Sequence, residues 1–119
     1  MHKFKELEIW KKSRIFSAKV YQATSVFPIE ERFGLTNQLR RASVSIPSNI
    51  AEGSSRNSDK DFARFLEIAI GSAYELETQL LISSDLGYLN EEHINDLLPL
   101  LSEITKITSR FKVTLLSSK

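Results

Sequence analysis

The feature that most constrains the fold of this chain is a helical spacing of small and apolar residues in four consecutive segments. Residues spaced alternately by three and four positions lie on one face of an α-helix. The first segment has this stripe at Ile9, Ser13, Phe16, Val20, Ala23 and Phe27. The second has it at Leu35, Leu39, Ala42, Ile46, Ile50 and Gly53. No stretch alternates apolar and polar residues long enough to predict a β-strand.

The third and fourth segments repeat the pattern. The third stripe consists of Phe62, Leu66, Ala69, Ala73, Leu76, Leu80 and Ser83. The fourth consists of Ile94, Leu97, Leu101, Ile104, Thr108, Phe111 and Leu115. Four amphipathic segments of this length predict four helices that share one core.

The ends of these helices are marked by residues that cap a helix or cannot continue one. Pro28 restricts the residue before it and closes the first helix. Gly53 suits a left-handed C-cap for the second, and Gly87 can end the third. Ser58 and Asp61 resemble a capping box at the start of the third. We therefore expect helices at about residues 5–26, 31–53, 59–86 and 91–116.

Four such helices with short connections predict an all-α fold, an antiparallel up-down-up-down four-helix bundle in a single domain over residues 1–119. Two prolines fall inside predicted helices. The stripe passes Pro47 without losing phase, which favours a kinked second helix over a phosphate-binding loop. Pro99 should either kink the fourth helix or delay its start.

Some apolar residues lie beside the core stripes of the third and fourth helices. They are Ile70, Tyr74, Leu81, Leu98 and Ile107. They either widen the buried face of each helix or form an exposed strip that a second copy covers. The small residues from Gly71 to Ala73 favour the second alternative, since they permit close approach of another helix.

Charge is distributed in blocks, although the formal net charge is only +1. Residues 1–64 carry 12 Lys and Arg against 7 Asp and Glu. Residues 65–105 carry 8 acidic residues and no Lys or Arg, and residues 106–119 carry 4 basic residues and no acidic ones. In an up-down bundle this distribution predicts one basic end, with both termini and the second connection, and one acidic end.

A basic end attracts phosphate, so the sequence predicts RNA or DNA as a partner. The candidate nucleic-acid-binding residues are Arg40, Arg41, Arg56, Lys60, Arg64, Arg110 and Lys112. The alternative is that these residues belong to an ordinary solvated surface of mixed charge and bind no ligand. The acidic end could equally dock a basic protein.

The sequence lacks the motifs of common catalytic and metal sites. The chain has no cysteine, and its two histidines are far apart. The Glu that a di-iron bundle places three residues before His is replaced by Asn90 before His93. We therefore predict no enzyme, no cofactor and no metal site.

The charged start of the chain and the lack of long apolar runs predict a cytoplasmic protein that does not associate with a membrane.

Two long blocks of sequence resemble a known family. Phe33–Arg56 reads FGLTNQLRRASVSIPSNIAEGSSR and Phe65–Leu80 reads FLEIAIGSAYELETQL, and the shorter EIWKKS and VFPIEE also fit. Together they resemble the bacterial four-helix-bundle proteins encoded by intervening sequences in 23S ribosomal RNA genes.

This resemblance implies a bundle that assembles as a ring, a homopentamer. It also implies kinship with the accessory variability protein of diversity-generating retroelements, which associates with reverse transcriptase and binds nucleic acid through basic surface. It implies no active-site residues. The leading hypothesis is a non-enzymatic oligomer that binds RNA or DNA non-specifically, and the alternative is a structural adaptor that docks a protein partner without nucleic acid.

Overall fold

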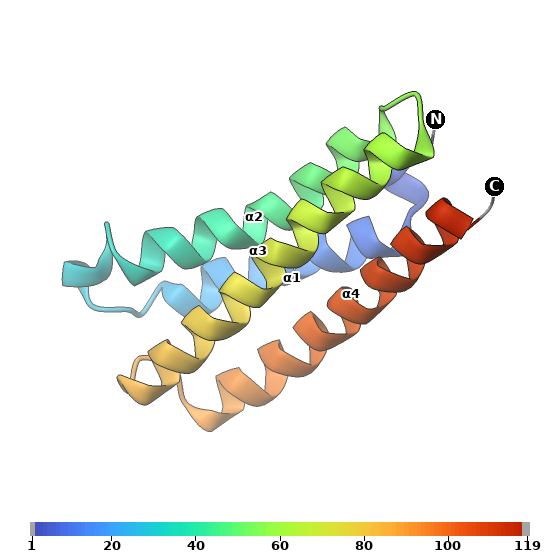
Figure 1. Ribbon diagram of the computed structural model, residues 1–119. Helices are drawn as coiled ribbons and strands as arrows, with labels where there is room; N and C mark the ends of the chain where they lie inside the picture. Colours follow the sequence, from blue (N-terminus) through green and yellow to red (C-terminus); the bar gives the residue numbers. More distant parts are fainter. Residues whose placement is uncertain (1, 118–119) are drawn as a thin grey trace.

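The computed structural model describes residues 2–117, which form an all-α four-helix bundle (Figure 1). Its helices are α1 (Glu8–Thr24), α2 (Leu35–Ser54), α3 (Asp59–Asp85) and α4 (Glu91–Ser117). Two short 3-10 turns, η1 (Phe4–Glu6) and η2 (Ile29–Glu31), precede α1 and α2. Within these residues there is no β-strand. The predicted fold class is therefore confirmed.

The helices pack in a ring in which α1 and α3 each contact both α2 and α4. The bundle is elongated and measures 48 × 24 × 20 Å. Figure 1 shows both termini and the α2–α3 connection at one end, and the α1–α2 and α3–α4 connections at the other. We call the first the terminal end and the second the connection end.

The predicted stripes form the core. All six residues of the first stripe, from Ile9 in α1 to Phe27 just after it, are buried, as are all seven of the α3 stripe. In α2 and α4 the exceptions are Leu35, Ile94 and Phe111, which are half-buried and pack against the core. Each fully buried Leu, Ile or Phe side chain contributes about 1.5–3 kcal/mol relative to an exposed one. The burial of these stripes is what holds the four helices together.

The first two helices begin later than the spacing predicts, because short 3-10 turns occupy their expected first turns. The Glu31 carboxylate, in η2, holds the end of the α1–α2 connection through two hydrogen bonds. Glu31 Oε1 accepts a hydrogen bond from the backbone N–H of Leu35 at 3.1 Å, which satisfies a free donor of the first turn of α2. Glu31 Oε2 accepts the Tyr88 hydroxyl at 3.1 Å. This side chain therefore ties the α1–α2 connection to the turn after α3.

The prediction that Gly53 is a left-handed C-cap is wrong. Gly53 lies inside α2, which continues to Ser54, and Gly87 is the described residue with positive φ, at 81°. The reason is packing against α3. A Cβ at Gly53 would lie 2.7 Å from Phe65 Cβ and 2.8 Å from Phe62 Cδ1. The glycine is therefore required for the close approach of α2 and α3.

Three other predictions about helix ends and prolines can be compared with the structure. The cap of α3 is confirmed, since Ser58 Oγ accepts the backbone N–H of Asp61 at 3.1 Å. Helix α2 continues through Pro47, as its unbroken stripe predicted, and its bend stays a prediction. Helix α4 starts at Glu91 and continues through Pro99, so this proline does not delay the helix.

Candidate nucleic-acid interface

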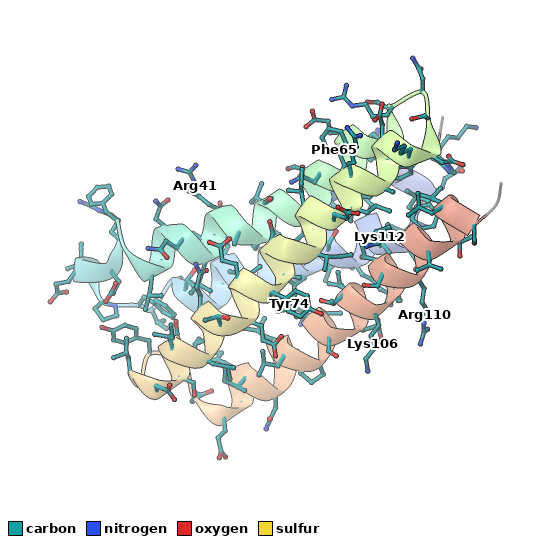
Figure 2. All side chains as sticks on the ribbon, viewed as in Figure 1. Arg41, Phe65, Tyr74, Lys106, Arg110 and Lys112 are labelled. Carbon is teal, nitrogen blue, oxygen red and sulfur yellow. The ribbon has the colours of Figure 1, made fainter. Side chains whose placement is uncertain are left out.

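An open groove between α1 and α4 gathers cationic side chains in the half of the bundle nearer the terminal end. It has a volume of about 630 Å³. Its lining consists of Lys12 from α1 and Pro99, Ser102, Glu103, Lys106, Ile107 and Arg110 from α4. Figure 2 shows Lys106 and Arg110 projecting from α4 on the side away from α3. We call this feature the α1–α4 groove.

The position of these side chains follows from the core stripe of α4. Leu101, Ile104 and Thr108 are buried and fix which side of the helix faces the bundle. Lys106 and Arg110 are four residues apart, so they are neighbours on the exposed side. The core packing therefore presents two cations together along one rim of the groove.

The negative charge in the α1–α4 groove is already paired. Glu103 Oε1 lies 2.8 Å from Lys12 Nζ. The hydrogen bond and the charge of Glu103 raise the pKa of Lys12 above its ordinary value. Among the described residues, neither Lys106 nor Arg110 forms an ion pair with a carboxylate, and both are exposed. The groove therefore has a positive charge available to an anionic ligand.

Arg40, one of the predicted binding residues, is engaged within the bundle. Its Nε donates to Thr24 Oγ1 at 2.9 Å, and its Nη2 donates to the Tyr21 carbonyl at 3.3 Å. Its guanidinium carbon also lies 4.7 Å from the centroid of the Tyr21 ring. Arg40 thus joins α2 to the end of α1. Arg41 is exposed and projects from α2 on the opposite side of the molecule from Lys106 and Arg110 (Figure 2).

The other predicted binding residues lie around the terminal end, and most are paired with acids. Arg56 Nη2 lies 2.9 Å from Glu52 Oε2, and its guanidinium carbon lies 4.7 Å from the Phe65 ring centroid. The remaining pairs are Arg64 with Asp61 at 4.0 Å and Lys112 with Glu67 at 3.9 Å. Lys60 is exposed and forms no ion pair with a described carboxylate.

The structure therefore does not bring the seven predicted residues together as one surface. Arg110 is the member that lies in the α1–α4 groove, and its neighbour there, Lys106, was absent from the prediction. The four-residue spacing of Lys106 and Arg110, opposite the stripe at Ile104 and Thr108, is the sequence signal that could have identified it. Lys12 could not have been placed in the groove without knowing that α1 lies beside α4.

The five predicted interface residues also divide into two groups. Leu98 and Ile107 are half-buried and pack against the core, so they widen the buried face of α4. Ile70 is half-buried, whereas Tyr74 and Leu81 are 60% and 45% exposed. Around them Ile68 and Ile82 are also exposed. We call Ile68, Gly71, Tyr74, Leu81 and Ile82 the α3 strip.

Gly71 has no packing role within one copy of the chain. It is exposed in the middle of α3, and a Cβ built on it would meet no other atom within 4 Å. A glycine inside a helix costs roughly 1 kcal/mol relative to alanine. The fold of a single chain does not account for this cost.

Both histidines are used in local structure. The His2 ring lies 5.1 Å from the Phe62 ring and 5.9 Å from the Phe111 ring, and its Nε2 lies 3.7 Å from Asp59 Oδ1. The His93 ring accepts the backbone N–H of Asn90 at Nδ1, at 3.4 Å, and the His93 backbone N–H donates to Asn90 Oδ1 at 2.8 Å. Over residues 2–117, no three acidic or histidine side chains are placed to hold a metal ion. In the same part of the chain, no helix combines the length and hydropathy that crossing a bilayer requires.

The fold and the groove define a class of protein: a four-helix bundle whose candidate site is an open charged surface. The family model for the 23S rRNA-intervening sequence protein matches residues 5–110, so the chain belongs to that family. It is also similar to a crystal structure of a protein of unknown function from the S23 ribosomal protein family of Bacteroides thetaiotaomicron. That structure has a TM-score of 0.79 and 25% identity, over 87% of this chain and 97% of the other. No curated protein matches the chain.

Proposed function

We propose that this protein is a non-catalytic, self-assembling cytoplasmic bundle that binds RNA or DNA without sequence preference through the α1–α4 groove. The observation that carries the proposal is the pair of exposed cations, Lys106 and Arg110, beside a glutamate already neutralised by Lys12. Such a surface suits the phosphate backbone, which every nucleic acid presents whatever its sequence. The ribosomal name of the similar family structure agrees with RNA as one ligand.

Fluorescence anisotropy with labelled 20-nucleotide RNA and single-stranded DNA tests this proposal at low salt. We expect both to bind, and we expect Lys106→Glu with Arg110→Glu to weaken binding by about tenfold or more, because each change replaces an attraction by a repulsion. The matched control is Arg32→Glu with Arg41→Glu. It makes the same change in net charge at exposed positions outside the groove.

Two outcomes contradict the proposal. If neither nucleic acid binds at low salt, the nucleic-acid role is wrong, and a nuclease-resistant protein complex would then favour the adaptor function. If both charge-reversed variants lose affinity equally, binding depends on net charge and the groove is not the site.

We also propose that five copies of the chain assemble into a ring through the α3 strip. The support is the exposed Tyr74 and Leu81 together with Gly71, which would let a helix of a second copy approach closely. Sedimentation velocity should give five times the mass of the chain. Gly71→Leu or Tyr74→Asp should shift it to single copies, whereas Val113→Asp, at an exposed valine of α4, should not. A wild-type protein that sediments as one chain at tens of micromolar would refute the ring.

A further inference from the structure

The connection between α1 and α2 presents the three most exposed large apolar side chains of the described residues. Val26, Ile29 and Phe33 are 72%, 74% and 82% exposed. A single exposed apolar residue needs no explanation, but three within eight residues of one connection are a feature that suits a partner. We call these three residues the apolar tip.

The apolar tip is held in a fixed shape. The buried Phe27 ring packs 5.3 Å from the Tyr88 ring, and Glu31 binds both the Leu35 N–H and the Tyr88 hydroxyl. The Arg32 guanidinium carbon lies 4.9 Å from the centroid of the Phe33 ring. The tip therefore presents its side chains on an ordered support, which lowers the entropy cost of docking.

The charges around the apolar tip are mostly acidic, and Arg32 beside the Phe33 ring is the exception. Glu30 follows Ile29 of the tip, and Asp85, Glu91 and Glu92 flank the α3–α4 turn at the same connection end (Figure 1). All four are exposed, and none forms an ion pair with a described basic residue. A partner for this end should therefore combine an apolar recess with positive charge.

The opposite end of the bundle offers such a recess. A pocket of about 520 Å³ lies between the N-terminal segment and the last turn of α2. It is lined by His2, Lys3, Phe4, Lys5, Glu6, Ala51, Ser54 and Ser55. The Phe4 ring packs 5.1 Å from the Trp10 ring, and the backbone N–H of His2 donates to the Ser54 carbonyl at 3.2 Å. Lys3 and Lys5 are exposed and have no described carboxylate partner.

We infer that the apolar tip of one copy docks into this terminal pocket of a second copy. Phe33 enters the recess, and Lys3 and Lys5 face the acidic residues around the tip. Tip and pocket lie at opposite ends of the molecule, so one chain cannot satisfy its own contact. The contact is head to tail and repeats along a line of copies. Because this contact is small, it forms at high local concentration. It weakens with salt because its charges are exposed.

The absence of cysteine from the chain allows a direct test by disulfide cross-linking. One variant carries Ser25→Cys, next to the tip, and the other carries Ser55→Cys, at the pocket. The control pair combines Ser25→Cys with Ser102→Cys in the α1–α4 groove. All three serines are exposed, so each change is conservative. The variants are mixed in equal amounts after nuclease treatment and oxidised mildly at low salt.

We expect the tip and pocket pair to give several-fold more linked heterodimer than the control pair. Adding Phe33→Asp to the Ser25→Cys chain, or high salt, should reduce the yield to the control level. Circular dichroism verifies that Phe33→Asp folds, as its exposure predicts. Equal yields from the two pairs, or a yield that Phe33→Asp does not change, would overturn the inference. Because nucleic acid is removed first, the result is independent of the proposed binding function.

Discussion

Gly53 gives the sharpest test of how α2 and α3 pack. Replacing it with alanine adds a single methyl group where the last turn of α2 meets the first turns of α3. The new Cβ would lie 2.7 Å from Phe65 Cβ and 2.8 Å from the Phe62 ring. The first of these atoms is fixed to the α3 backbone and cannot rotate away, so the two helices must separate.

Two opposing effects set the size of the change. Overpacking a filled interior typically costs about 1–3 kcal/mol. The better helix propensity of alanine returns roughly 1 kcal/mol. We therefore expect Gly53→Ala to lower the free energy of unfolding by about 1 kcal/mol. For a domain of this size that corresponds to a fall in Tm of about 4 °C.

Urea unfolding followed by circular dichroism measures this change, and Gly71→Ala is the matched control. The same methyl group at Gly71 meets no atom within 4 Å, so only the propensity gain remains. At low protein concentration we expect Gly71→Ala to raise the free energy of unfolding by about 1 kcal/mol. If Gly53→Ala were as stabilising as Gly71→Ala, the proposed close contact of α2 with Phe62 and Phe65 would be refuted.

Three further predictions concern contacts that shape the bundle. Arg40→Ala should lower the free energy of unfolding by about 1 kcal/mol through the lost bond to Thr24, without changing nucleic-acid affinity; a loss of affinity alone would contradict its structural role. Ser58→Ala should cost about 1 kcal/mol in urea unfolding by removing the cap of α3, whereas Ser58→Gly should cost only a few tenths, and equal losses would contradict this capping. Partial burial and the hydrogen bond to Glu31 raise the pKa of Tyr88 above its usual 10.0, so stability should fall as pH rises above 10. In a variant whose other two tyrosines are phenylalanine, absorbance at 295 nm should show Glu31→Gln lowering that pKa, and an unchanged midpoint would contradict the role of Glu31.

The spacing of apolar residues was sufficient to predict the four helices and nearly all of the core. Phe16, Leu66 and Ile104 are buried as expected, because burying an apolar stripe is possible only with that side of the helix inward. Glycine was harder to interpret. Gly53 ends one stripe and Gly87 follows another, but of the two only Gly87 has positive φ. The difference depends on Phe62 and Phe65, whose position against α2 is a tertiary contact that spacing along the chain does not report.

Charged residues were predicted less well for the same reason. Arg40 and Arg41 are adjacent in the sequence, yet one bonds to Thr24 and the other is exposed. Lys112 counts as a free charge in the sequence but lies 3.9 Å from Glu67 of α3. The α1–α4 groove depends on Lys12 lying across from Glu103, residues far apart in the chain. Whether a charge is available to a ligand is decided by such neighbours.

The salt dependence of nucleic-acid affinity tests most directly whether the α1–α4 groove binds phosphate. The affinity for single-stranded RNA is measured over a range of salt for wild type, Lys106→Ala with Arg110→Ala, and the control Arg32→Ala with Arg41→Ala. Each phosphate contact contributes about 0.7 to the slope of log affinity against log salt concentration. The groove variant lacks two of these contacts, so we predict that its slope is shallower than that of the wild type by about 1.4. The control should keep the wild-type slope. Equal slopes for all three proteins, or no binding at low salt, would contradict the account.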